Sequence, residues 1–260
     1  MSTRPSGGWQ GVLDSPVVGM APWIIFSVLV GPGRFELSVV LALAVSLLLV
    51  VAGRVVRPGS SWKLLEVSDV VFFAALTAVG AAASPGTRRW LETYAGEVSN
   101  LALVLIAFGS MAVRMPFTLQ YARERVDREH WDSPGFVRAN YVITGVWGLA
   151  FLVAAIAGGY GDLVLNDPDN LWTGWIIQIA AIVGAVRFTE WYPNVVRARA
   201  LGQAHRAPSV GSLVLPLAGL LVPVGIAVLI FDGHLWWLGV ALILCGGALV
   251  RWLRRDTPAS

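Results

Sequence analysis

The sequence predicts an all-α protein, a polytopic transmembrane helical bundle of about eight spans with both termini in the cytoplasm. Of the 260 residues, 56% are hydrophobic and only 13% are charged, whereas soluble domains usually have about a quarter of their residues charged. The mean hydropathy is +0.68, and the apolar residues form long blocks, as they do in membrane proteins. In addition, the basic residues collect between alternate blocks.

Charge-free runs give the expected spans. Crossing the hydrocarbon core takes about 20 apolar helical residues, with about 17 as the lower limit. Backbone groups in lipid must be hydrogen-bonded within their own segment, so each run is expected to be helical. The first run contains Pro16 and Pro22 and is either a full crossing or a tilted or re-entrant segment. The runs are Ser15–Gly33, Leu37–Gly53, Val70–Thr87, Val98–Val113, Ala139–Gly161, Asn170–Val186, Ala207–Phe231 and Gly233–Val250.

The distribution of basic residues predicts the orientation. With a cytoplasmic N-terminus and eight crossings, 16 of the 19 basic residues fall on the cytoplasmic side, Arg4 and Arg57 among them. Only Arg34, Arg88 and Arg89 fall outside. An excess of Lys and Arg in cytoplasmic loops is the usual pattern in membrane proteins. A missed or extra span in the middle of the chain would destroy this asymmetry.

Several functional classes are disfavoured. The pI near 9.4 would also suit a nucleic-acid-binding protein, but the basic residues form short strips between spans, so no nucleic-acid partner is expected. The single cysteine, Cys245, cannot form an internal disulfide or a metal-binding pair. The three histidines are scattered, and the sequence has no HExxH, CxxC or GxSxG motif. We therefore expect no catalytic residue, no metal site and no cofactor, and the sequence leans against an enzyme.

Two charged pairs are candidates for a polar membrane site, because an ionised group within a span costs about 2.5–3.5 kcal/mol or more. Glu66 and Asp69 share one helical face at the inner end of the third span. They would form either an ion-pair cluster with Lys63 or a proton or cation site. Arg187 and Glu190 have the same spacing at the inner end of the sixth span. They would form either an interfacial ion pair or a pocket for a lipid phosphate.

Three uncharged polar residues belong to the same candidate site. Such residues usually form hydrogen bonds between helices, worth about 0.6 kcal/mol each. The alternative is contact with a substrate. These residues are Asn100, Asn140 and Gln178.

Residues 116–138 form the one sizeable polar segment, between the fourth and fifth spans. Pro116 can open a helix, and the charges of the following RERVDRE run nearly cancel, so attraction to anionic lipid is not its obvious purpose. We interpret it as a short cytoplasmic interfacial helix followed by a turn at Pro134 and Gly135. It is the candidate surface for docking a partner or lipid. The residues expected to take part are Arg114, Gln120, Arg123, Arg125, Arg128 and Trp131.

The same junction resembles a known family. A basic-Pro-hydrophobic-x-Gln stretch leaves one span, and a Trp…Asn…Trp…Phe stretch enters the next. This order resembles the intracellular septation protein A family of bacterial inner-membrane proteins, over about residues 12–192. The sequence departs from the family in its longer RERVDRE run and in the two spans after Pro208. The residues that carry the likeness are Arg114, Pro116, Phe117, Gln120, Trp131, Phe136, Asn140, Trp147 and Phe151.

The resemblance implies two regions and a role. Residues 1–192 would form a six-helix membrane region of septation protein A type that includes the cytoplasmic interfacial segment. Residues 193–260 would form a cytoplasmic loop and a C-terminal two-helix hairpin. The implied protein is a multi-pass, non-enzymatic component of the bacterial cytoplasmic (inner) membrane. It would support cell-envelope maintenance or division through other integral membrane proteins, and no catalytic residue is transferred.

Two other functions stay open. A small-molecule or ion transporter is suggested by prolines in the first and seventh runs, because broken helices often line binding sites. A membrane enzyme acting on lipid headgroups would use Arg187 and Glu190, although no nucleophile–base pair is visible. The lipid bilayer is the one partner that the composition requires, and the sequence specifies neither a substrate nor an oligomeric state.

Overall fold

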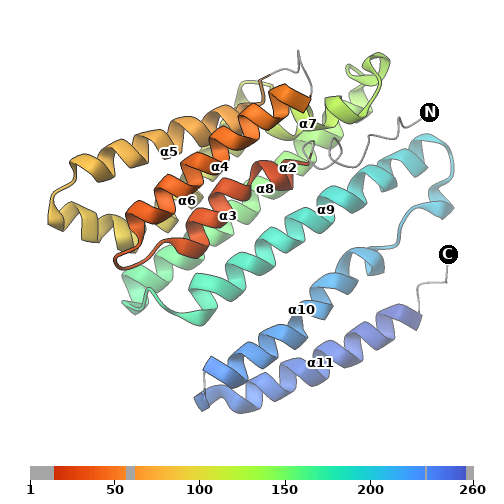
Figure 1. Cartoon of the computed structure of the whole chain (residues 1–260). Coiled ribbons are helices and arrows are strands. Elements are labelled where there is room, and N and C mark those ends of the chain that lie inside the picture. The colour runs from red at the N-terminus through yellow and green to blue at the C-terminus, as the bar shows by residue number, and fades with distance from the viewer. Residues whose placement is uncertain (1–14, 57–61, 232, 256–260) are drawn as a thin grey trace. The chain divides into compact units, whose positions relative to one another are not determined.

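A computed structural model describes residues 15–56, 62–231 and 233–255. All regular elements in these residues are helical, and none of them is a strand. Seven of the described helices are long and apolar enough to cross a membrane. Together with a shorter first segment they form the polytopic bundle of about eight spans that the sequence predicts, so the fold class is confirmed (Figure 1). Arg4 and Arg57, which were assigned to the cytoplasmic side, lie outside the described residues.

The chain divides into two compact units, Met1–Pro168 and Asp169–Ser260. The division expected from the family resemblance, between residues 192 and 193, stays a prediction. Labels with η denote short 3-10 or π-helical segments. The first unit contains α2 (Pro16–Gly19), α3 (Ala21–Leu29), α4 (Phe35–Val56), α5 (Leu64–Ala82), α6 (Pro85–Ala112), α7 (Phe117–Arg125), η1 (Arg128–His130), α8 (Pro134–Tyr160) and η2 (Gly161–Leu165). The second contains η3 (Trp172–Ile176), α9 (Ile177–Ala200), η4 (Ala204–Arg206), α10 (Val210–Phe231), η5 (Gly233–Leu235) and α11 (Trp236–Arg255).

The first segment consists of the two short helices α2 and α3. Ser15 caps α2 by accepting a hydrogen bond from the Val17 N–H at 3.3 Å. Pro16 and Pro22 each lie in the first turn of a helix, where proline removes no intrahelical hydrogen bond. The prolines therefore begin helices here and interrupt none. The end of α2 lies against the start of α5, because a Cβ atom on Gly19 would lie 3.1 Å from Leu65.

Helices α5 and α6 begin before the charge-free runs that marked them, and α5 ends at Ala82, before the end of its run at Thr87. α5 begins at Leu64, and α6 begins at Pro85, well before the expected start at Val98. The start of α6 is fixed by local chemistry, because Ser84 accepts a hydrogen bond from the Thr87 N–H at 3.2 Å and proline favours the first helical position. A charge-free run therefore locates a helix but does not fix its ends.

The segment between α6 and α8 contains the short helix α7, as expected, and then the single turn η1. The expected turn at Pro134 and Gly135 is wrong. Pro134 is instead the first residue of α8, with Ser133 before it in extended conformation, and this is again the helical position that proline prefers.

The interior of the first unit is packed with aromatic side chains. Trp23, Phe26, Phe35 and Phe73 are all buried, and their ring centroids lie 5.0–6.4 Å apart in the Trp23–Phe73, Phe26–Phe73 and Phe26–Phe35 pairs. Gly80 allows this packing, because a Cβ atom there would lie 2.5 Å from the Phe35 ring. Large apolar side chains also face outward, as a lipid-exposed surface requires. Examples are Leu48, Val55, Leu105 and Ile156.

In the second unit, α10 and α11 form a close hairpin. A Cβ atom on Gly225 would lie 2.6 Å from the Gly239 carbonyl oxygen, so the two backbones are nearly in contact, as small residues allow in membrane helices. α10 is one continuous helix although it contains Pro216 and Pro223. The prolines of the seventh run therefore do not divide it into two half-helices, which weakens the observation that suggested a transporter.

Candidate functional site

Asp69 is the centre of a buried polar group in the first unit. α5 directs its side chain toward α3, and only 1% of the residue is exposed. Its Oδ1 atom accepts a hydrogen bond from the Trp23 indole N–H at 2.6 Å. Phe73, one turn later on α5, lies against the same indole, with ring centroids 5.0 Å apart. Because burying a carboxyl group is costly unless it is hydrogen-bonded, Trp23 both satisfies and orients Asp69.

Tyr121 lies beside Asp69 and belongs to the same buried polar group. It comes from α7 and is 2% exposed, and a Cβ atom on Gly19 would collide with its hydroxyl. Among the described residues, the hydroxyl has no hydrogen-bond partner. Burial raises the pKa of the Tyr121 hydroxyl well above its ordinary value, and the carboxyl groups of Glu66 and Asp69 act in the same direction. The hydroxyl therefore stays protonated and is available as a donor.

Lys63 and Glu66 lie at the edge of the same group. The Lys63 Nζ atom is 3.4 Å from Glu66 Oε1 and 4.6 Å from the centre of the Tyr121 ring. We call Trp23, Lys63, Glu66, Asp69 and Tyr121 the Asp69 cluster. Within it, Glu66 is held by an ion pair and Asp69 by an indole, so two carboxyl groups one helical turn apart have different partners.

Gln120 has a role within the fold. Its Oε1 atom accepts a hydrogen bond from the Leu64 N–H at 2.5 Å. That N–H belongs to the first turn of α5 and would otherwise have no intrahelical partner. Gln120 therefore fixes α7 against the start of α5, next to the Asp69 cluster, although the sequence suggested it as a docking residue.

Asn140 belongs to a separate polar contact between α7 and α8. Its Nδ2 atom donates to the Phe136 carbonyl at 2.9 Å, and its own carbonyl accepts from the Thr118 hydroxyl at 3.1 Å. Thr118 and Thr144 also share a hydrogen bond of 2.8 Å. The two bonds of Thr118 join α7 to α8 within residues 116–138, which we call the docking segment. Asn100 lies half-buried on α6.

The remaining residues of the predicted polar site lie in the second unit. Gln178 donates to the Thr173 carbonyl at 3.0 Å. The Arg187 and Glu190 side chains form an ion pair of 2.7 Å and are 37% and 60% exposed. The indole N–H of nearby Trp191 donates to the Pro208 and Ser209 carbonyls. Of the predicted polar residues, the structure therefore brings only Glu66 and Asp69 into the Asp69 cluster.

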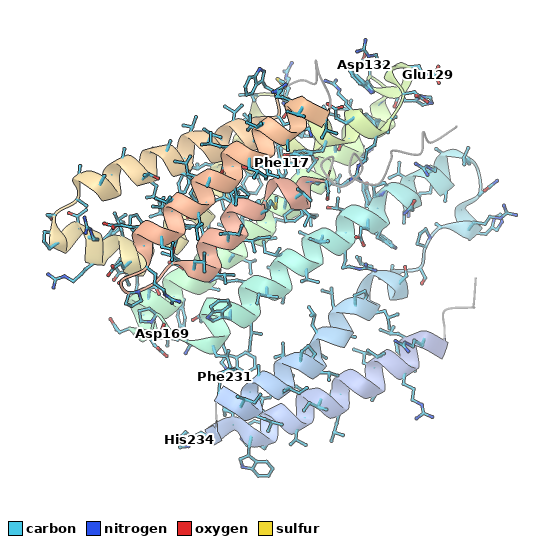
Figure 2. All side chains as sticks on the ribbon, in the orientation of Figure 1. Phe117, Glu129, Asp132, Asp169, Phe231 and His234 are labelled. Atoms are coloured by element: carbon cyan, nitrogen blue, oxygen red, sulfur yellow. The ribbon has the colours of Figure 1, made fainter. Side chains whose placement is uncertain are left out.

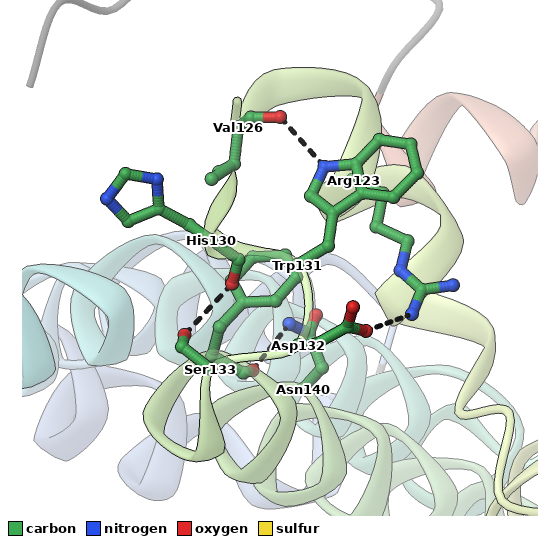
Figure 3. A network of polar contacts seen from close by, with 8 residues as sticks. Arg123, Val126, His130, Trp131, Asp132, Ser133 and Asn140 are labelled. Carbon is green, nitrogen blue, oxygen red and sulfur yellow. Dashed lines mark hydrogen bonds and ion pairs between the residues drawn. The ribbon is translucent and has the colours of Figure 1, made fainter. Parts of the chain in front are cut away.

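The docking segment folds around Trp131 (Figure 3). Its indole N–H donates to the Val126 carbonyl at 2.9 Å, and the Arg123 guanidinium lies 5.3 Å from the ring centre. Arg123 also forms an ion pair of 3.6 Å with Asp132, and Arg128 lies 5.6 Å from the same ring. The segment is therefore a defined surface and not a loose loop.

Two other docking candidates lie outside this arrangement. Arg114 follows α6 and has a φ of +59°, in the left-handed region, and its side chain is exposed. Arg125, the last residue of α7, is also exposed.

Sequence reasoning overlooked a second pair of carboxyl groups. Glu97 on α6 and Asp162 in η2 lie close enough for their carboxyl groups to interact. Both residues stood at the edges of charge-free runs, where an isolated acidic residue is usually an interfacial group. Only the pairing of α6 with α8 brings them together.

The Asp69 cluster contains two carboxyl groups, a protonated hydroxyl and an ammonium group, beside the aromatic rings of Trp23, Phe73 and Tyr121. Within the described part of the chain, no group of three His, Cys, Asp or Glu side chains could hold a metal ion. Chemically, the cluster can either hold α3, α5 and α7 together or bind a proton or small cation. Comparison of the chain with protein-family models, curated proteins and solved structures finds no match.

Proposed function

We propose that this membrane-embedded helical protein has a non-enzymatic role in the bacterial cytoplasmic membrane. In this proposal it supports cell-envelope maintenance or division through membrane partners that bind residues 116–138. The observation that carries the proposal is the two-sided structure of this docking segment. One of its sides is buried in the bundle and its other side is charged and exposed. The distant resemblance to septation protein A proteins supplies the envelope role.

The buried side makes the segment rigid. Phe117, Leu119 and Tyr121 are buried, and Figure 2 shows Phe117 directed into the first unit. Gln120 bonds α7 to α5, and Thr118 bonds α7 to α8, so α7 is fixed to both helices. A surface that is already ordered loses less conformational entropy when it binds a partner.

The exposed side carries charges of both signs. Glu129 and Asp132 project from the segment (Figure 2), and Arg125, Asp127 and Arg128 are also exposed. A membrane surface rich in anionic lipid would favour a uniformly basic face. Mixed charge instead suits a protein surface of complementary pattern, in which the charges set specificity and rate of association.

The proposal is tested by replacing Arg123, Arg125 and Arg128 together with alanine in the full chain. A photoreactive amino acid at Glu129 would cross-link the partner in intact cells, and a strain that lacks the chain would show whether the variant restores growth and envelope integrity. We expect loss of both the cross-link and the restoration. The matched control replaces Arg251 and Arg254 with alanine, and it should retain both.

Two of these arginines contact Trp131, so loss of local structure must be separated from loss of docking. The triple replacement by lysine keeps the charges and should keep the cross-link, while thermal unfolding in detergent reports the fold. If the triple alanine variant cross-links the same partner and restores growth fully, the docking role is wrong.

A transporter is the second candidate, and the burial of Asp69 within a membrane span favours it. Ionisable residues at such positions often mark proton or ion pathways. The purified chain in proteoliposomes would then show substrate or proton flux that Asp69→Asn abolishes. Flux that is equal in the variant and the native chain would exclude Asp69 as the coupling group.

A further inference from the structure

The three basic residues that the orientation leaves on the outer side lie close together at one end of the first unit. Arg34 is in the loop between α3 and α4, while Arg88 and Arg89 are in the first two turns of α6. The loop is joined to α6, because the Gly33 N–H donates to Glu92 Oε1 at 3.0 Å. Basic residues are uncommon on this side of membrane proteins, so their concentration at one place calls for a reason.

A hollow lies at this place. Ala83, Pro85, Arg88, Arg89 and Glu92 line it, and its volume is about 270 Å³. This size is near the lower end of the range for small-molecule pockets, which begins at about 300 Å³. It accommodates one compact headgroup or a small anion with its hydration water.

Of the charged side chains around the hollow, Arg88 and Glu92 have partners and Arg89 has no ion-pair partner among the described residues. Arg88 is fixed by an ion pair of 2.9 Å with Glu36 on α4, and its buried Nε atom has no hydrogen-bond partner among the described residues. Glu92 is engaged by the Gly33 N–H. The Arg89 side chain is exposed and forms no ion pair with any residue in the described part of the chain. One guanidinium is therefore anchored and the other is free to bind a ligand.

Two further features favour an anion. The hollow adjoins the N-terminus of α6, where the helix dipole and the first N–H groups favour negative charge. One turn further, Trp90 is exposed and its ring centroid lies 5.3 Å from that of Tyr94. Exposed indoles concentrate at the headgroup level of a bilayer, so the hollow is expected at the depth of lipid phosphates.

We propose that this hollow binds a phosphate group, through Arg89 and the Nε side of Arg88. Guanidinium groups match phosphate oxygens in a two-point geometry that a lysine cannot provide. The phosphate belongs either to an anionic lipid of the outer leaflet or to a soluble phosphate compound, since both present the same oxygens. The proposal is independent of the docking segment and its partners.

The test uses the purified full chain with two probes. Native mass spectrometry in detergent measures binding of phosphatidylglycerol against phosphatidylcholine, and titration calorimetry measures binding of inorganic phosphate. Arg89→Gln should weaken binding about tenfold, because a charge-assisted hydrogen bond is lost. Glu92→Gln keeps an acceptor for the Gly33 N–H but removes the negative charge, so it should strengthen binding severalfold. Arg251→Gln, which makes the same change of charge outside the hollow, should have no effect.

Each outcome decides the proposal. Lipid binding that follows these variants identifies an outer-leaflet lipid as the source of the phosphate, and inorganic phosphate binding that follows them identifies a soluble compound. If neither probe binds, or if Arg89→Gln and Arg251→Gln behave alike, no phosphate site exists here. Arg89 and Glu92 are at the surface, so both variants are expected to fold, and thermal unfolding checks this.

Discussion

The Asp69 cluster and the Arg187–Glu190 pair begin from the same sequence pattern and end in opposite environments. Each contains charged residues three positions apart, at the predicted inner end of a membrane helix. Asp69 is 1% exposed, whereas the Arg187 and Glu190 side chains are 37% and 60% exposed. Spacing within one helix therefore determines which side chains share a face, but it does not determine what covers that face.

The difference comes from segments distant in the sequence. α3 supplies Trp23 and α7 supplies Tyr121, so two separate elements cover the start of α5. On α9 the neighbours of the ion pair are the helix's own aromatic residues, where Phe188 and Tyr192 stack with centroids 5.0 Å apart. A polar group that other elements cover can bind a ligand selectively or stabilise the fold. An exposed ion pair contributes little to ligand selectivity or to stability.

The largest effect is expected from Trp23→Phe. A smaller aromatic ring remains, but the indole N–H is lost, so Asp69 stays buried without its donor. Leaving a buried acceptor unsatisfied costs about 1–3 kcal/mol, and more when it is charged. The free energy of unfolding, measured by denaturant titration in detergent, should fall by at least this amount. Trp252→Phe, at an exposed indole, is the control and should have little effect.

A double-mutant cycle assigns this loss to the hydrogen bond. In an Asp69→Leu background, Trp23→Phe should cost much less, with a coupling energy of about 0.5–3 kcal/mol. Equal losses in both backgrounds would show that the indole contributes only by packing against Phe73, and the contrast with α9 would then lose its basis.

A second effect is expected in the pH dependence of stability. Folding raises the pKa of Tyr121, so above about pH 10, the ordinary pKa of tyrosine, the unfolded chain loses a proton that the folded chain keeps. The contribution is fully present below that pH and is lost as the pH rises further, by up to about 1.4 kcal/mol per pH unit. Unfolding titrations between pH 8 and about 11.5 should show this alkaline loss.

Tyr121→Phe removes the titrating group and should flatten the profile. At neutral pH it should cost little or increase stability, because the hydroxyl has no partner among the described residues. Tyr160→Phe, at an exposed tyrosine, provides the comparison and should leave the alkaline loss in place. An unchanged profile in Tyr121→Phe would mean that the hydroxyl is hydrated in the folded protein.

The fold could be predicted from the sequence because charge-free runs and the distribution of arginines respond directly to the bilayer. Helix ends could not be, since the start of α6 depends on the local capping by Ser84 and Pro85. In the candidate site, Glu66 and Asp69 stood out because ionisable groups in spans are rare. Trp23, 46 residues from Asp69, and Tyr121 looked like ordinary apolar residues, and only packing reveals them as partners.

The smallest effect is expected from Arg187→Gln. An exposed ion pair usually contributes no more than about 1 kcal/mol, so the free energy of unfolding should change by less than that. The residual effect should shrink further in about 1 M salt, where the screening length falls to about 3 Å. Lys63→Gln makes the same change of charge in the buried ion pair with Glu66 and should cost more, with little dependence on salt. If Arg187→Gln costs over about 2 kcal/mol, or is insensitive to salt, this part of α9 is covered in the folded protein. The Arg187–Glu190 pair would then have to be treated as a second buried site.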